Sequence, residues 1–424
     1  MAAGEEGNHR GLPLQKTSQK TLFNSLMKAI LFSSQRRKGE PAPEHLPLLS
    51  HLHLTDVPVP DLPNENWTVI KSKIAGICGS DLGFLQGKPM PAAEPYFRLP
   101  IIPGHELFGE IAALGKKVRG FHVGQRVSID PTLGCKERGF TTLCPQCRHG
   151  NPGICEHLAE GNLSPGILIG TCRDTGGGWG EYFVAPSHRL FPVPDKINDD
   201  EASLLEPFSV CLRAVLNNPP QKRELIVVIG AGTIGLMNIA ALKAVEPTCR
   251  VACVAKYPFQ AELARTLGAE HVLDSQNDEV MEYVGELAQT KVYKLSSGGA
   301  LLAGGVRVVY DTVTNAATIN QSLRMTRGKG IVVILGLAAL PREVDWTPIW
   351  LKEITVVGSL TYGAEVFKGK RADTFARAID FLTRRRADLT PVRPRKYPLD
   401  HYREALSEAA SKKTSGAVKV SFAF

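Results

Sequence analysis

Six short apolar runs between residues 225 and 360 constrain the fold of this chain more than any other feature. Stretches with helical periodicity, such as 259–269 and 316–325, separate most of them. Runs rich in β-branched residues are typical of strands buried on both faces, and their alternation with helices predicts a parallel sheet covered on two sides. The runs are 225–230, 250–255, 271–274, 306–313, 330–337 and 355–360.

A glycine-rich turn follows the first of these runs. The segment VVIGAGTIG places Gly230, Gly232 and Gly235 at the G-x-G-x-x-G spacing. Here the first glycine permits a tight turn, the second lets a diphosphate approach the backbone, and the third allows close packing of helix and strand. Thr233 and Ile234 open the helix whose N-terminus would face the negative charge. The pattern predicts a doubly wound Rossmann domain that binds a dinucleotide, with an ordinary turn as the alternative.

The end of the second run indicates which cofactor is bound. Domains that bind NAD usually carry Asp or Glu at this position, where the carboxylate accepts the ribose hydroxyls. Here the run ends at Ala255, and Lys256 and Tyr257 follow. An uncharged residue followed by a cation suits a 2′-phosphate, so we expect NADP(H) rather than NAD(H). The alternative is a solvent-facing Lys256 beside a pocket of relaxed preference.

With 424 residues, the chain is expected to form two domains. Residues 27–205 carry a mostly β pattern punctuated by Gly and Pro, and we expect them to form a catalytic domain. Residues 206–362 form the expected Rossmann domain, and 363–424, with a helix at 373–386 and a closing strand, return to the first. Residues 1–26 read as a flexible extension. Further strands are expected at 67–80, 108–114, 124–129, 181–185 and 417–424.

Charge and hydropathy exclude several classes of protein. The net charge of +8 lies at the C-terminal end, where 366–424 hold 14 Lys and Arg against 6 Asp and Glu. We interpret these cations as a solvated face, with Arg384, Arg385 and Arg386 placed favourably at the end of a helix, and expect no nucleic-acid partner. The apolar stretch 225–245 contains spaced glycines, Asn238 and Lys243, which favour a strand and helix over a membrane span. No secretory signal is visible, so we expect a cytoplasmic, reducing location without membrane attachment.

Four of the nine cysteines lie close together in residues 133–157. Disulfides, a redox pair and a metal site are the possible explanations. A reducing compartment makes structural disulfides improbable, and no thioredoxin-like unit surrounds the CPQC segment. Cys172, Cys211, Cys249 and Cys253 show no metal spacing and are interpreted as packing residues. The clustered cysteines are Cys135, Cys144, Cys147 and Cys155.

Elsewhere, Cys78, His105, Glu106 and Glu206 are of the types that zinc prefers. Each of them alone has an ordinary explanation, because a buried cysteine is commonly a small hydrophobe. The segments that contain these residues occur in a fixed order along the chain, and the combination is far more specific than any one of them. The segments concerned are GICGSD (76–81), PGHE (103–106), CPQCRHGNPGIC (144–155), GGWGEYF (177–183), LLEP (204–207) and GAGTIG (230–235).

These segments resemble those of the zinc-dependent medium-chain dehydrogenases/reductases, from Met27 to the C-terminus. Glu206 before a proline is similar to the polyol, sugar and threonine dehydrogenase branch. The resemblance implies a mostly β, GroES-like catalytic domain beside the Rossmann domain. It also implies that Cys78, His105 and Glu206 bind the catalytic zinc, with Glu106 as a fourth ligand or as a group that exchanges with water.

The family also implies roles for residues near these ligands. Ser80 would be the hydroxyl that begins proton transfer. The chain departs from the family's pattern where a histidine often follows, because Gly83 and Phe84 stand there. The sequence therefore does not identify the group that carries the proton outward, and water or Glu106 could take this part.

The cysteine cluster resembles the structural zinc lobe of the same family. Cys144, Cys147 and Cys155 match its last three ligands, whereas the usual first position holds Thr141. Cys135 is the nearest replacement, and the loop between it and Cys144 can close around a metal at little entropic cost. We therefore expect two zinc ions per chain, with an unmetallated loop or a redox pair as alternatives.

The resulting hypothesis is hydride transfer between NADP(H) and an alcohol, polyol or sugar hydroxyl, or the corresponding carbonyl. The alternative is a non-catalytic NADP(H)-binding sensor or scaffold. The resemblance implies a homodimer, through residues 355–362, or a homotetramer. The sequence does not identify the substrate. Our candidates for the substrate pocket are Phe84, Trp179, Arg213 and Tyr362.

Overall fold

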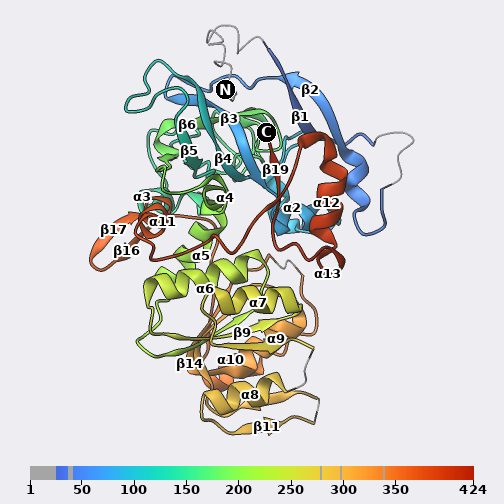
Figure 1. The fold of residues 1–424 in the computed structure, drawn as a ribbon, viewed down its shortest axis with the longest axis vertical. Coiled ribbons are helices and arrows are strands. Elements are labelled where there is room, and N and C mark those ends of the chain that lie inside the picture. Colours follow the sequence, from blue (N-terminus) through green and yellow to red (C-terminus); the bar gives the residue numbers. More distant parts are fainter. Residues whose placement is uncertain (1–24, 37–41, 277–278, 297, 338–339) are drawn as a thin grey trace, which may run out of the picture.

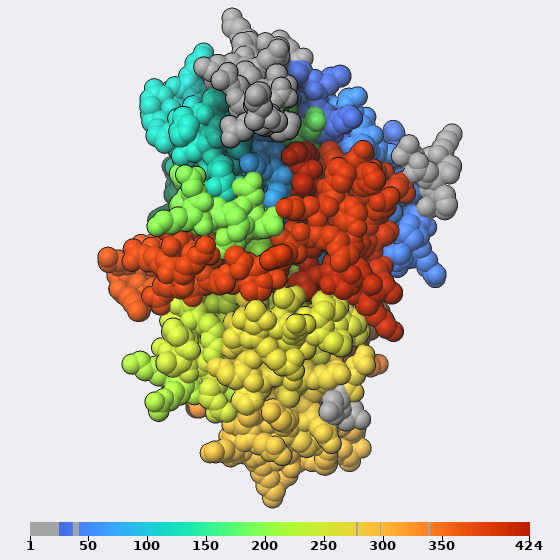
Figure 2. Space-filling view, viewed as in Figure 1, coloured from blue at the N-terminus to red at the C-terminus, as the bar shows by residue number. Residues whose placement is uncertain are grey.

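The computed structural model describes residues 25–36, 42–276, 279–296, 298–337 and 340–424 (Figure 1). The expected extension 1–26 therefore lies outside the described residues except at its last two positions. One large sheet forms the centre of each half of the molecule. The C-terminal residues, red in Figure 2, cross the molecule where the two halves meet.

The lower half in Figure 1 contains a six-stranded parallel sheet in the order β10-β9-β8-β13-β14-β15. All six strands coincide with the apolar runs, and the order is that of a doubly wound Rossmann sheet. The predicted fold is confirmed. The strands are β8 (Leu225–Ile229), β9 (Arg250–Ala255), β10 (His271–Asp274), β13 (Val306–Asp311), β14 (Thr326–Ile334) and β15 (Thr355–Gly358).

Alternate residues of these strands enter separate cores. Val228 and Cys253 pack in the core that includes α5 and α6, whereas Val227 and Ala252 pack against α8 on the opposite face. This is the two-sided burial that the apolar runs predict. The helices of this half are α6 (Thr233–Val245), α7 (Pro258–Thr266), α8 (Val280–Leu287), α9 (Ala316–Met325) and α10 (Thr347–Lys352). None of the described helices is long and apolar enough to cross a membrane.

The upper half is built on a mostly β sheet in the order β18-β19-β3-β4-β5-β7, with β6 also paired to β3. Strand β19 pairs antiparallel with β3, so the C-terminal segment adds to a sheet that begins near residue 67. The strands are β3 (Trp67–Gly76), β4 (Glu106–Leu114), β5 (Arg126–Ile129), β6 (Tyr182–Pro186), β7 (Leu190–Pro192), β18 (Arg395–Tyr397) and β19 (Val420–Ala423).

Smaller elements complete the molecule. The hairpins β11–β12 and β16–β17 are details that the sequence pattern did not indicate. The remaining strands are β1 (Leu26–Phe32), β2 (Leu52–Pro58), β11 (Val292–Lys294), β12 (Ala300–Leu302), β16 (Ala364–Phe367) and β17 (Lys370–Asp373). The remaining helices are α2 (Gly79–Leu85), α3 (Pro145–Arg148), α4 (Asp199–Ser203), α5 (Leu205–Asn217), α11 (Thr374–Thr383), α12 (Tyr402–Ala410) and α13 (Lys412–Ser415).

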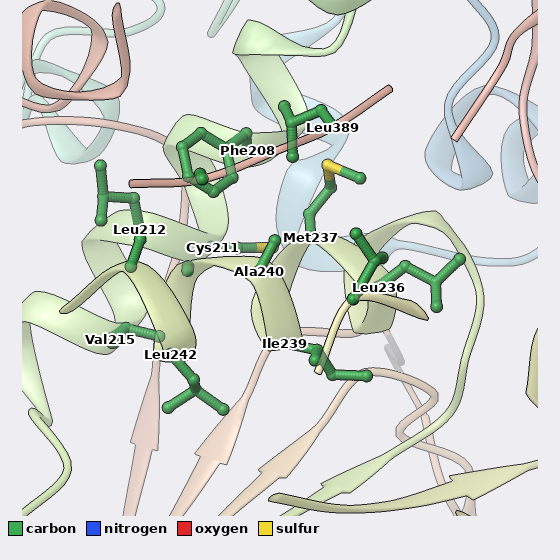
Figure 3. Packing of buried hydrophobic residues seen from close by; sticks show 14 of the residues in the cluster. Phe208, Cys211, Leu212, Val215, Leu236, Met237, Ile239, Ala240, Leu242 and Leu389 are labelled. Carbon is green, nitrogen blue, oxygen red and sulfur yellow. The ribbon is translucent and has the colours of Figure 1, made fainter. Parts of the chain in front are cut away.

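Helix α5 joins the two halves through its packing on α6 (Figure 3). Its apolar side chains interleave with those of α6, and Leu389 of the C-terminal segment closes the same cluster. The side chains in Figure 3 include Phe208, Cys211, Leu212 and Val215 of α5, and Leu236, Met237, Ile239, Ala240 and Leu242 of α6.

Replacing Leu212 by alanine is expected to lower the free energy of unfolding by about 2–5 kcal/mol, because the removed methyl groups leave a cavity in a fully buried cluster. The matched control is Val123→Ala at an exposed position, with an expected change within about 0.5 kcal/mol. Urea unfolding followed by circular dichroism measures both. Equal midpoints for the two variants would contradict this account of the α5–α6 packing.

Candidate active site

The first candidate ligand, Cys78, lies at the junction of β3 and α2. The strand ends at Gly76, and Cys78 caps the N-terminus of α2. Its backbone amide donates to Asp81 Oδ2 at 2.8 Å, which closes the first turn. This capping bond fixes the position from which the half-buried thiol projects.

His105 lies immediately before β4 and is buried. Its Nδ1 lies 3.6 Å from Asp81 Oδ1, an orientation that leaves Nε2 for a metal. Burial opposes the charged form, but the Asp81 carboxylate and the Cys78 thiol together raise the pKa of His105 well above its usual value. Asp81 thus contacts two candidate ligands, and the sequence analysis missed its role.

Glu206 lies in the first turn of α5 and is buried. Burial and the nearby Glu106 carboxylate raise the pKa of Glu206 to about 8, and its charge acts on His105. The structure therefore brings Cys78, His105 and Glu206 together from three separate elements. Their ligand atoms do not all lie within 4.8 Å of one another. Among the described residues, these atoms are therefore farther apart than the sulfur atoms of the cysteine cluster.

Glu106 is held by a cation that the sequence analysis did not identify. Lys419, just before β19, donates from Nζ to Glu106 Oε2 and to the Ile77 carbonyl at 3.1 Å. Both side chains are at most 2% exposed. One carboxylate oxygen of Glu106 thus binds Lys419 and is not available to a metal. This favours Glu106 as a group that exchanges with water over Glu106 as a permanent fourth ligand.

Burial of a charged carboxylate costs free energy unless the carboxylate is protonated or paired with a cation. Glu106, Glu206 and Asp81 all lie here, and Lys419 pairs with only one of them. A divalent cation held by thiolate, imidazole and carboxylate would supply the missing positive charge. The donor set therefore fits zinc, which prefers these three ligand types.

The phosphate-binding loop has the geometry that its glycines predict. Gly230 has φ +96°, and a Cβ there would lie 2.6 Å from Val313 Cγ2. Gly232 is the N-cap of α6, and a Cβ on Gly235 would collide with the carbonyl oxygen of Gly230. The third glycine thus lets helix and strand approach closely, as expected.

The first turn of α6, which contains Thr233 and Ile234, also touches the C-terminal segment. Thr233 Oγ1 donates to the Val418 carbonyl at 2.9 Å. Beside this bond lies a cavity of about 20 Å³, lined from both halves by residues including Ile77, Gly79 and Lys412. A cavity of this size has room for about one water molecule and not for a dinucleotide.

The residues after β9 follow the expected pattern. Ala255 is buried at the strand end, and Lys256 is exposed with its Nζ 5.6 Å above the Tyr257 ring. No carboxylate stands at the end of the strand itself.

The four clustered cysteines meet in space. Their sulfur atoms all lie within 4.8 Å of one another, and Cys135 takes part despite its unusual spacing. Each sulfur accepts a backbone N–H, for example Cys144 N to Cys135 Sγ at 3.3 Å and His157 N to Cys155 Sγ at 3.3 Å. A hydrogen bond from Cys147 lowers the pKa of Cys155 to about 5, whereas burial raises the pKa of Cys135 to about 11 and the hydrogen bond to Cys155 raises the pKa of Cys147. One thiol of the four is thus ionised most easily, and the other three would lose their protons to a bound metal. Thiolates stabilised in this way are the ligands of a Cys₄ zinc site.

Arg138 explains how the long loop from Cys135 to Cys144 is ordered. Its guanidinium is fully buried and donates only to backbone carbonyl oxygens, so it ties the loop to the segment that follows the last cysteine. The acceptors are the carbonyl oxygens of Leu133, Glu160, Leu163, Ser164 and Gly166.

Two of our four candidate pocket residues have structural roles instead, so those expectations were wrong. Arg213 donates to the carbonyls of Leu360 and Tyr362 at 2.7 and 3.1 Å and to Asn151 Oδ1 at 2.7 Å. Tyr362 is buried, with its ring centroid 4.9 Å from that of Phe375. Their sequence positions, in α5 for Arg213 and shortly after β15 for Tyr362, could not reveal these tertiary contacts.

Trp179, a third candidate for the substrate pocket, is also a buried core residue. Its Nε1 donates to the Gly76 carbonyl at 3.4 Å, and its ring meets the Phe422 ring edge-on. Phe84 packs beside Phe32 with ring centroids 4.9 Å apart, so an aromatic contact occupies the place of the family's histidine. Ser80 is half-buried in the first turn of α2.

A further cavity lies away from the candidate metal ligands. It measures about 550 Å³ and is lined by parts of β1, β2 and the loop after Cys135, including Val59, Pro60 and Glu137. No candidate metal ligand lines it.

Comparison with known proteins adds to this geometry. Residues 64–195 match the alcohol dehydrogenase GroES-like domain, and 233–384 match the zinc-binding dehydrogenase family. Sorbitol dehydrogenase of Bacillus subtilis (strain 168) is 28% identical over 363 residues, which are 84% of this chain and 90% of that protein. L-threonine 3-dehydrogenase of Rhizobium etli (strain CIAT 652) is 29% identical over 369 residues, 87% of this chain and 94% of that protein.

Solved structures share the fold. A dehydrogenase structure from Sinorhizobium meliloti 1021, with NADP bound, has a TM-score of 0.71 at 25% identity, covering 94% of this chain and 100% of that one. The structure of 2R,3R-butanediol dehydrogenase from Bacillus subtilis has a TM-score of 0.72 at 24% identity, covering 94% and 99%.

Replacing Lys419 by methionine is expected to destabilise the protein by about 3–5 kcal/mol, because it leaves the Glu106 carboxylate buried without its counterion. The double variant Lys419→Met with Glu106→Gln should recover part of this loss, since the uncompensated charge is gone. Thermal unfolding of the two variants and of Glu106→Gln alone measures the coupling. Additive losses would contradict a direct pair.

Proposed function

The chain belongs to the zinc-dependent medium-chain dehydrogenases/reductases and is an NAD(P)-dependent oxidoreductase of alcohol or polyol CH–OH groups; we propose that its catalytic centre is formed by Cys78, His105 and Glu206. The observation that carries this proposal is the convergence of these three donors, two of them buried and one half-buried, from three separate elements. Substrate would be a secondary alcohol, polyol or sugar hydroxyl, or its carbonyl. A non-catalytic sensor is not supported, because both matching family models are those of dehydrogenases.

Each residue of the centre has a defined task. When bound, zinc supplies a Lewis acid for the substrate oxygen, and the nicotinamide supplies the hydride chemistry. Asp81 orients the His105 ring and fixes the capping turn that presents Cys78. Lys419 holds Glu106 in place, while Ser80 is the hydroxyl through which a substrate proton would leave.

We propose that NADP(H) is preferred. Lys256 is exposed at the end of β9, next to the place where the adenosine ribose lies in Rossmann domains. Its ammonium can reach a 2′-phosphate, and Ala255 offers no carboxylate to the ribose hydroxyls.

We also propose a structural zinc at the Cys₄ group of Cys135, Cys144, Cys147 and Cys155, giving two zinc ions per chain. Three observations support it: the short separations of the four sulfur atoms, their backbone N–H donors, and the lowered pKa of Cys155. We also propose a reducing, cytoplasmic location, because a reducing compartment keeps these four thiols available to a metal.

A homodimer or homotetramer is proposed through the edge of the Rossmann sheet. Strand β15 pairs on one side only among the described residues, and large apolar side chains near it face solvent. Trp350 is 70% and Trp346 53% exposed, and Leu351, Val356 and Leu360 lie nearby in the chain. Exposed apolar surface at an unpaired sheet edge is typical of a subunit interface.

Metal content and turnover test the two zinc sites. Protein purified without added metal should contain two zinc ions per chain and oxidise NADPH with some member of a carbonyl panel. Cys78→Ser should fall to one zinc and lose at least about 10³-fold in kcat/KM, whereas Cys135→Ser should lose the other zinc. Full turnover in zinc-depleted Cys78→Ser protein would refute the catalytic role.

Lys256→Ala should raise the KM for NADPH about tenfold and leave that for NADH unchanged within about twofold, because only NADPH has the 2′-phosphate. Steady-state kinetics with both cofactors measures the change. Lys222→Ala, an exposed cation that precedes β8, serves as control. Parallel losses for both cofactors would contradict recognition of the 2′-phosphate by Lys256.

A further inference from the structure

Helix α13 brings an unassigned cation to the phosphate-binding loop. In Figure 1 this short helix lies where the C-terminal segment passes between the two halves of the molecule. Lys412 is its first residue, and Lys412 Nζ lies 3.7 Å from the position that a Cβ on Gly232 would occupy. Apart from Gly232 and its two chain neighbours, no other heavy atom of the described residues lies within 4 Å of that position. The ammonium therefore faces the backbone that a diphosphate approaches.

The ammonium of Lys412 has no hydrogen-bond or ion-pair partner among the described residues. Burial, and then repulsion by Lys419, lower the pKa of Lys412. A half-buried cation of this kind gains from an anion placed beside it.

The other cations near the loop are not available for this task. Lys419 is engaged by Glu106 and the Ile77 carbonyl. Gly79 lines the small cavity beside Thr233 together with Lys412, but it has no side chain that could bind a phosphate. Lys413, the next residue of α13, is exposed.

We infer that Lys412 is a binding residue for the diphosphate of the nicotinamide cofactor, supplied from the C-terminal segment. The dipole of α6 and its free N–H groups then hold one side of the diphosphate, and the ammonium holds the other. The flexible stem of lysine lets the ammonium move with the C-terminal segment as the cofactor enters. This inference rests on the proposed cofactor binding and adds a residue outside the glycine loop.

Four proteins test the inference: wild type, Lys412→Met, Lys412→Arg and Lys413→Met. Methionine keeps an apolar stem without the charge, arginine restores the charge, and Lys413→Met makes the same change in net charge on the same helix. Dissociation constants are measured by calorimetry for NADPH and ADP-ribose, and by competition for adenosine 2′-phosphate, which lacks the diphosphate. Zinc content and thermal midpoint are recorded for each protein.

Lys412→Met should weaken NADPH and ADP-ribose by about 10- to 100-fold, as expected for loss of a charge-assisted hydrogen bond. Adenosine 2′-phosphate should change by less than about twofold, Lys412→Arg should recover most of the affinity, and Lys413→Met should bind like wild type. Equal affinities for Lys412→Met and Lys413→Met, or equal losses for ADP-ribose and adenosine 2′-phosphate, would overturn the inference alone. Absence of NADPH binding by wild type would overturn the proposed function as well.

Discussion

The packing of α5 on α6 sets the distance between the proposed metal ligands and the phosphate-binding loop. Glu206 begins α5, and the loop begins α6, so the apolar contact between the two helices places one site relative to the other. Neither helix could shift along the other without opening cavities in a close-packed core. The catalytic geometry thus depends on an apolar interface that contains no reacting group.

A second constraint is the concentration of buried charge at the upper end of α5. Asp81, Glu106 and Glu206 lie within mutual electrostatic range, and Lys419 and His105 are the cations nearest to them. Buried ions of this kind stabilise a fold only as a complete set. Metal binding and folding are therefore expected to be coupled here, since zinc would complete the balance of charge.

The sequence alone predicted the six Rossmann strands, because apolar runs are dictated by burial on both faces. It missed the early start of β14 at Thr326, since Arg327 and Lys329 hide the strand among exposed polar residues. The clustering of Cys135 with its three partners was expected from the resemblance to the family's zinc lobe, with Cys135 as the nearest replacement for the missing first ligand. Lys419 could not be found, because its pairing with Glu106 spans 313 positions and has no local signature.

The cysteine lobe also touches the segment that directly follows β15. Arg213 joins Asn151 to Leu360, Arg371 donates to the His149 carbonyl, and a Cβ on Gly153 would collide with Thr361. The cysteine lobe, residues 133–157, thus packs against the segment that follows the sheet edge of the proposed subunit interface. If this lobe holds zinc, loss of that metal would weaken the support behind the proposed subunit interface, so the quaternary structure would depend on a metal that takes no part in catalysis.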